Sequence, residues 1–339
     1  MPSAQQSTAM TSHACSLSVV QLCKAAGDPL RANILRLLAH DSFGVLELCS
    51  IFDMAQPAMS HHLKCLAEAG LVQKRPEGTF VFYQRARPES EFVQSLFAGL
   101  DAEYDNQMDS SVAAIYKTRA ERSIAFFESH ADALHQQQTR VCHADVYRQA
   151  VLNTIQRLPE TSRSKALEVG PGDGSLLQDL SRLFSKAEGI DTSATTLKAA
   201  EVATGNCQNV KLTHADFMKI PPVRRANAIV ATMVIHHIAS PQAFFFQAGN
   251  HLRNGGLLVV AELIQHEQRW VTEACGDIWL GFTPAQLIQW SDDAGFEHLD
   301  QQILAQRNGF TVQVHAFQLL QPEQSTGPPP PPGTKKRRT

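Results

Sequence analysis

A short apolar strand, a glycine-rich turn and a helix follow one another near the middle of this 339-residue chain. Residues 166–169 are apolar except for Glu168. Three glycines follow at alternate positions: Gly170, Gly172 and Gly174. Glycines let the backbone approach a ligand closely, and a helical pattern begins directly after them. A dinucleotide site has its third glycine one position later, where this chain has Ser175, so the spacing predicts a cofactor site that disfavours nicotinamide and flavin nucleotides.

Polar residues follow the ends of further apolar runs. Asp191 ends a second predicted strand, where a carboxylate can accept two hydrogen bonds from ribose hydroxyls. Asp216 ends a third strand, and its carboxylate suits an adenine amino group. A fourth strand ends at His236 and His237, and the glycine turn 255–256 precedes a fifth strand. Strands alternating with helices predict an α/β doubly wound domain.

This ordered series resembles the class I S-adenosylmethionine-dependent methyltransferases, over residues from about 145 to 320. The resemblance implies a Rossmann-like, seven-stranded sheet, and a turn at Asn308 between the last two predicted strands is similar to the closing antiparallel pair of that fold. In the family, Glu168 and the three glycines would hold the methionine part of S-adenosylmethionine or S-adenosylhomocysteine, Asp191 the ribose and Asp216 the adenine. For each acid taken alone, the alternative is a helix cap or a solvated turn.

The first hundred residues have a different pattern. Asp28 followed by proline predicts the start of a helix, and a second short helix is expected at about residues 45–52. A third helix carries an apolar inner face and ends at Gly70. Two strands around the turn 76–78 complete the pattern. These elements predict an α+β winged helix-turn-helix domain.

This segment, roughly residues 18–100, resembles the ArsR family of bacterial winged-helix repressors. The run 55–63 is similar to the family's recognition helix but departs from it at its start. The resemblance implies binding to double-stranded operator DNA by a homodimer paired through the helix 89–108 and the N-terminal helix. The predicted DNA contacts are the outward residues of the recognition helix, which would face the major groove, and two basic residues of the wing near phosphate. On the helix they are Gln56, Ser60, His61 and Lys64, and on the wing Lys74 and Arg75. A helix-turn-helix used only for packing is the alternative.

The cysteines do not indicate a metal site. The chain has seven cysteines and no CxxC pair, and the positions that carry thiols in metal-sensing ArsR proteins are Gly44 and Leu46 here. An odd number of scattered thiols fits a reducing compartment. Since no long apolar run or signal sequence is evident, we expect a cytoplasmic protein without a membrane partner.

The composition along the chain predicts five segments. They are a disordered N-terminus (1–15), the winged helix-turn-helix domain (16–108), a helical connection and lid (109–160), the methyltransferase domain (161–321) and a disordered proline-rich basic tail (322–339).

Two functions are compatible with this organisation. One is a DNA-binding transcriptional regulator whose methyltransferase-like domain binds S-adenosylmethionine or S-adenosylhomocysteine as effector. The other is an active methyltransferase for a small-molecule acceptor, with an appended DNA-binding domain. The cofactor residues do not separate the two. A base for an oxygen or nitrogen acceptor could lie at His236 or His237, although both could equally support the strand end, so no catalytic residue is assigned.

Overall fold

A computed structural model describes residues 18–78, 80–103, 109–221 and 226–321. The chain forms two compact units. The first extends to Ser123 and also includes Glu267–Leu280, and the second comprises Ile124–His266 and the chain from Gly281 onward. The terminal segments predicted to be disordered lie outside the described residues, and so does the C-terminal end of the helix predicted at 89–108. No described helix is long and apolar enough to cross a membrane.

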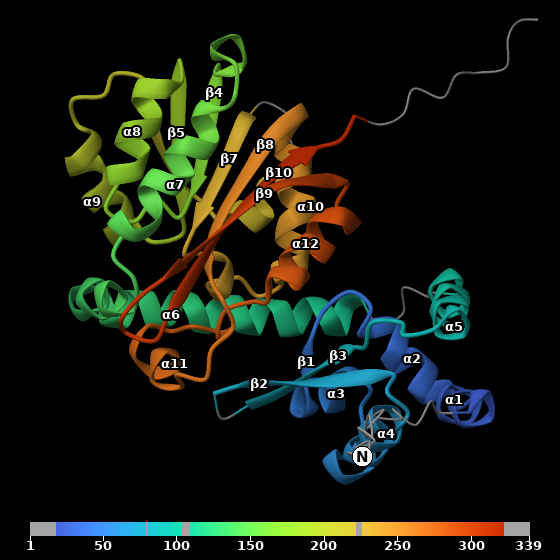
Figure 1. The fold of residues 1–339 in the computed structure, drawn as a ribbon. Helices are drawn as coiled ribbons and strands as arrows, with labels where there is room; N and C mark the ends of the chain where they lie inside the picture. The colour runs from blue at the N-terminus through green and yellow to red at the C-terminus, as the bar shows by residue number, and fades with distance from the viewer. Residues whose placement is uncertain (1–17, 79, 104–108, 222–225, 322–339) are drawn as a thin grey trace, which may run out of the picture. The chain divides into compact units, whose positions relative to one another are not determined.

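The first unit contains a helix-turn-helix followed by a wing (Figure 1). Its helices are α1 (Val19–Ala26), α2 (Pro29–Leu37), α3 (Val45–Ile51), α4 (Gln56–Glu68) and α5 (Glu91–Ala102). Its strands are β1 (Phe43–Gly44), β2 (Val72–Glu77) and β3 (Phe80–Arg85). Among the described residues they pair antiparallel in the order β1-β3-β2. The predicted winged helix-turn-helix is therefore confirmed.

Local sequence signals account for the helix boundaries in this unit. Asp28 accepts a hydrogen bond from the Arg31 amide at 3.0 Å and so caps α2, with Pro29 at the first helical position. Ser18 and Gln21 form a reciprocal capping box at the start of α1. The turn after α4 needs a left-handed residue, and Gly70 supplies it with φ of 64°.

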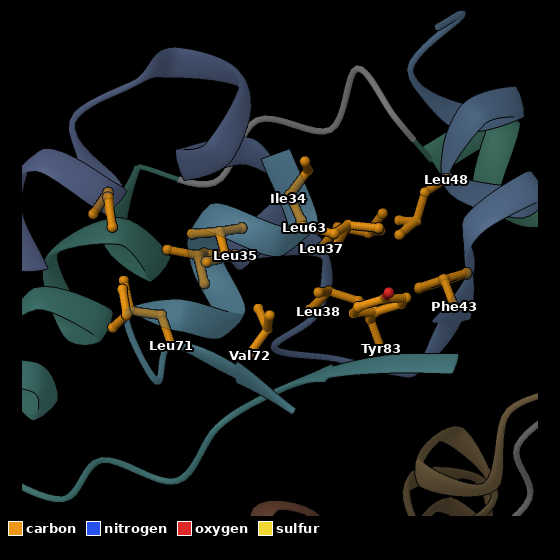
Figure 2. Close-up of a cluster of buried hydrophobic side chains, with 14 of the residues drawn as sticks. Ile34, Leu35, Leu37, Leu38, Phe43, Leu48, Leu63, Leu71, Val72 and Tyr83 are labelled. Carbon is orange, nitrogen blue, oxygen red and sulfur yellow. The ribbon is translucent and has the colours of Figure 1, made fainter. Parts of the chain in front are cut away.

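An apolar cluster holds these helices against the sheet. Figure 2 shows side chains from α2, α3 and α4 meeting those of β1, β2 and β3. The buried face of α4 is the predicted one: Met59, Leu63 and Leu66. Because this cluster fixes one face of α4, the opposite face remains at the surface.

The second unit is built on one twisted sheet (Figure 1). Its strands are β4 (Lys165–Val169), β5 (Lys186–Asp191), β6 (Val210–His214), β7 (Ala226–Thr232), β8 (Leu252–Leu263), β9 (Phe296–Ala305) and β10 (Thr311–Leu319). Within the described ranges their order is β6-β5-β4-β7-β8-β10-β9. All neighbours are parallel except β10, which is antiparallel to both β8 and β9. The predicted seven-stranded, Rossmann-like sheet and its closing antiparallel pair are confirmed.

Helices cover both faces of this sheet (Figure 1). On one side lie α7 (Asp145–Gln156), α8 (Ser175–Leu183) and α9 (Ala194–Thr204), and on the other α10 (Pro241–His251) and α12 (Pro284–Asp293). Short 3-10 turns at Glu160–Ser162, Phe217–Lys219 and Ile235–His237 complete the unit. Because the parallel strands run in one direction, the glycine loop after β4 and the turns after β5, β6 and β7 meet at one edge of the sheet.

Two features differ from the sequence-based expectation. The segment 109–160 was predicted to be a separate helical connection, but the boundary between the two units lies inside it, within the long helix α6 (Asp109–Val141). No glycine or proline interrupts that stretch, so nothing ends the helix earlier. The segment Glu267–Leu280, with α11 (Trp270–Ala274), lies inside the predicted methyltransferase domain in sequence but belongs to the first unit.

Candidate functional site

The three glycines after β4 have different roles. A Cβ on Gly170 would lie 2.8 Å from Val234 Cγ2, and one on Gly174 would lie 2.7 Å from Ala200 Cα. Both glycines therefore permit close packing within the protein. Gly172 has φ of 54°, and no described atom beyond its chain neighbours lies within 4 Å of the position that its Cβ would take. Gly172 thus exposes bare backbone to open space, as a ligand-binding turn requires.

Glu168, at the end of β4, is a buried acid beside this turn. Its side chain is 1% exposed, and among the described residues its Oε2 has no hydrogen-bond partner. Burial raises the pKa of Glu168, and the nearby Asp173 raises it further. An unsatisfied buried oxygen costs about 1–3 kcal/mol unless a donor reaches it. The pairing that Glu168 lacks is what the amino group of a bound ligand could supply.

Asp191 ends β5 at the same edge of the sheet. One oxygen, Oδ1, accepts a hydrogen bond from the Ser193 amide at 2.7 Å. Burial raises the pKa of Asp191 to about 6, against the lowering effects of that amide and of His214. A carboxylate that is partly desolvated gains more from a pair of hydroxyl donors than a solvated one does.

Asp216 has local partners for both oxygens. Oδ1 accepts a hydrogen bond from the Met218 amide at 3.0 Å, and Oδ2 lies 3.0 Å from Lys219 Nζ. The side chain caps the short turn after β6, which is the alternative role considered from the sequence. The adenine contact therefore remains a prediction for Asp216 and would have to compete with this cap.

A histidine–glutamate pair lies at the ends of β7 and β8. Glu262 Oε2 lies 2.7 Å from His236 Nδ1, and Glu262 Oε1 accepts hydrogen bonds from the amides of Ile235 and His236 at 2.7 and 3.3 Å. Both side chains are buried. Met233, two residues before Ile235, has φ of 52°, a conformation that is uncommon for a non-glycine residue and is concentrated at functional sites.

Sequence reasoning missed two residues at this edge. Glu262 interrupts an otherwise apolar strand, and this buried acid is a signal that could have been used. The phenol of Tyr147 on α7 lies near Thr232 at the end of β7, and burial raises the pKa of this phenol. Nothing in the sequence around Tyr147 indicates this contact, because α7 and β7 are far apart along the chain.

The candidate DNA surface lies on α4. The four predicted residues of this helix are all exposed: Gln56, Ser60, His61 and Lys64. Three of them recur at intervals of four residues and so lie along one stripe of the helix. Contact between this stripe and DNA bases remains a prediction.

The prediction for Arg75 needs correction. Its side chain is 3% exposed and pairs with the buried carboxylate of Glu77. The guanidinium also lies 5.1 Å from the centre of the Trp279 ring. Successive strand residues face opposite sides, so the exposed basic residue of β2 is its neighbour Lys74.

A family described as a methyltransferase domain matches residues 135–313. The chain belongs to this family. Residues 28–74 match the bacterial regulatory protein, arsR family, and the N-terminal region is an ArsR-family helix-turn-helix domain. The protein thus joins an ArsR-type regulator domain to a class I methyltransferase domain.

Individual relatives match one part each. An uncharacterized HTH-type transcriptional regulator of Methanocaldococcus jannaschii is 47% identical over 66 residues, which are 19% of this chain and 72% of that protein. A demethylmenaquinone methyltransferase of Tropheryma whipplei is 29% identical over 148 residues, 42% of this chain and 60% of that enzyme. The N-methyltransferase NodS of Bradyrhizobium japonicum, in complex with S-adenosyl-l-homocysteine, has a TM-score of 0.44 and 14% identity, covering 55% of this chain and 98% of that one.

Proposed function

We propose that this protein is a DNA-binding transcriptional regulator whose methyltransferase domain binds S-adenosylmethionine or S-adenosylhomocysteine as effector. The observation that carries the proposal is the pairing of an exposed recognition helix with an open glycine loop in one chain. Gly172 offers bare backbone, and Glu168 has an unsatisfied buried oxygen beside it. These features support a ligand with an amino group held against the turn and a ribose held by Asp191.

The DNA-binding part of the proposal concerns operator recognition by a homodimer. Gln56, Ser60, His61 and Lys64 would face the major groove, with Lys74 at the wing near phosphate. Two valines at the start of α1, Val19 and Val20, are 52% and 62% exposed. Apolar side chains at that surface support pairing of two copies through α1 and α5, which would present two recognition helices to two half-sites. Binding to operator DNA also sets the proposed location as the cytoplasm.

The direct test is a ligand titration combined with DNA binding. A duplex selected from a random pool by the protein serves as operator. Calorimetry with S-adenosylmethionine and S-adenosylhomocysteine gives the nucleoside affinities, and fluorescence anisotropy gives operator affinity with each ligand at saturation and without it. The proposal expects nucleoside binding and a change in operator affinity. Nucleoside binding with unchanged operator affinity would exclude the effector role.

One observation supports the enzymatic alternative. Glu262 Oε2 lies 2.7 Å from His236 Nδ1 and so orients the ring. Such a pair could accept a proton from an oxygen or nitrogen acceptor during methyl transfer. Turnover of S-adenosylmethionine with an acceptor, abolished in Glu262→Gln, would favour this function.

A further inference from the structure

The segment Glu267–Leu280 leaves the methyltransferase sequence and completes the winged-helix unit. Trp279 is 1% exposed, and its ring lies 4.9 Å from the ring of Phe82 on β3, centre to centre. The guanidinium groups of Arg75 and Arg119 lie 5.1 and 5.2 Å from the same indole. An indole that contacts Phe82 and Arg75 of the wing and Arg119 of α6 is a strong anchor, because aromatic faces attract desolvated guanidinium groups.

A buried ion pair ties the wing to the end of this segment. Glu77 is the last residue of β2 and is 2% exposed. It pairs with Arg75 and accepts a hydrogen bond from the Leu280 amide. Burial raises the pKa of Glu77, whereas Arg75 lowers it, so the carboxylate depends on its partners to remain charged. Removing one partner of such a buried pair is strongly unfavourable. The position of the wing is therefore linked to the position of Leu280.

The two ends of the segment are anchored together at the end of β8. The Phe282 amide donates to Leu263 O at 3.0 Å, and the Gln265 amide donates to Phe282 O at 3.2 Å. Gln313 Nε2 donates to the same Phe282 carbonyl at 2.6 Å. Gly281 has φ of 74°, and a Cβ there would lie 2.7 Å from Ile264 O. Leu263–Gln265 and Gly281–Phe282 thus form a tight junction at the two ends of the segment, and position 281 accommodates only glycine.

This junction adjoins the ligand-facing edge of the methyltransferase sheet. Glu262 precedes Leu263 and binds the amides of Ile235 and His236. Val234, directly before them, is the residue that packs against Gly170 of the glycine loop. A continuous series of contacts and covalent bonds therefore runs from the glycine loop through the β7 end, Glu262 and the junction to Leu280 and the wing.

We infer that the segment Glu267–Leu280 transmits occupancy of the nucleoside site to the DNA-binding wing. The inference rests on the proposed function, since it names how one site regulates the other. A ligand acts on a distant site only through its differential affinity for two states of the molecule. Here a shift of the β7 end moves Glu262 and the junction, and the junction changes the hold of Leu280 and Trp279 on Glu77 and Arg75.

The first experiment measures coupling in variants of the contact. Operator affinity is measured with and without saturating S-adenosylhomocysteine in wild type, Glu77→Gln and Trp279→Leu, with Glu273→Gln as control because Glu273 is exposed on the same segment. We expect a ligand effect of roughly 5- to 150-fold in wild type and in the control. We expect an effect below about twofold in both contact variants, with nucleoside affinity retained. A full ligand effect in both contact variants would overturn the inference.

The second experiment reports on the segment without DNA. Replacing Trp270 and Trp290 by phenylalanine leaves Trp279 as the only tryptophan of this chain. Titration with S-adenosylhomocysteine should change its emission, and the Glu262→Gln substitution should abolish that change. Unchanged Trp279 emission at saturating ligand contradicts the inference even if DNA binding responds. If the ligand changes the Trp279 emission but not the operator affinity of wild type, the proposed regulatory function is wrong, whereas the link from the nucleoside site to the segment is supported.

Discussion

Gly172 is the residue at which a side chain would meet a ligand instead of the protein. We predict that Gly172→Val lowers S-adenosylhomocysteine affinity at least about 100-fold, because the side chain fills the space that the ligand needs and adds strain at positive φ. Gly255→Ala is the matched control, since Gly255 also has positive φ and open space around its Cβ position. Calorimetry measures both. Equal affinity losses in the two variants would mean that backbone strain alone is responsible.

If Asp191 holds the ribose as proposed, nucleoside binding should depend on pH. The pKa of Asp191 is raised to about 6 by burial. In the proposed site the ribose hydroxyls would bind the carboxylate form. Affinity should therefore be constant above about pH 7 and fall as pH drops through 6, approaching tenfold per pH unit. Asp191→Asn should remove this dependence and cost about 1.5–3 kcal/mol at pH 8. A wild-type affinity that stays flat from pH 8 to pH 5 would refute the ribose contact.

The sequence predicted the residues that surround this site better than their individual roles. The glycine spacing and the acids at strand ends are local patterns, so the positions of Glu168 and Asp191 at the ends of β4 and β5 could be predicted from them. Asp216 and Arg75 could not be judged in the same way. The side chain of each interacts with a residue two or three positions away. Whether it binds that residue or a ligand depends on burial, which the sequence does not show. Glu262 could have been noticed as an acid within an apolar strand, but its partners, like those of Tyr147, are tertiary contacts that leave no local pattern.

Two exposed residues of the recognition helix α4 are predicted to make different kinds of DNA contact. We predict that Gln56→Ala lowers operator affinity and relaxes preference at one base pair by about 1–3 kcal/mol, since an amide can read a base edge. Lys64→Ala should weaken binding evenly across sequences and reduce the salt dependence. Anisotropy titrations with operator duplexes altered at single positions compare the two. Even losses for both variants would mean that α4 contacts phosphate only.

The hairpin β9–β10 should lose stability in acid. His315 is fully buried, its Nε2 lies 2.9 Å from Gln313 Oε1, and burial lowers its pKa to about 4. A histidine with a depressed pKa favours folding above its unfolded value of about 6.5, and this contribution is lost as pH falls towards 4. The loss amounts to about 3 kcal/mol. Denaturant unfolding measures the free energy of unfolding of wild type and His315→Gln from pH 7 to pH 4. If this free energy changes equally with pH in the two proteins, the prediction is wrong.

Among the elements, the periodic ones were predictable and the connections were not. The strands of the sheet and the helices α2 to α4 are defined by turns and apolar spacing, and α2 also by the cap of Asp28. The length of α6 and the placement of Glu267–Leu280 depend on which surface a segment packs against. Trp279 and Leu280 contact β2 and β3, which lie about two hundred residues earlier. No local periodicity reports such a contact.

At the scale of the whole molecule, two domains that each match a known family are joined by more than one connection. The chain passes between the units within α6 and again at both ends of Glu267–Leu280. Because the two units share several covalent connections, a conformational change in one unit is expected to affect the other at each connection. Coupling between nucleoside and operator is the expected consequence.

Linkage provides the most direct measurement of the central claim. S-adenosylhomocysteine affinity is measured by calorimetry on the free protein and on the protein saturated with operator, at one pH and salt concentration. The account predicts that operator changes nucleoside affinity by the same factor, about 5- to 150-fold, by which nucleoside changes operator affinity. Identical nucleoside affinity with and without operator would contradict it.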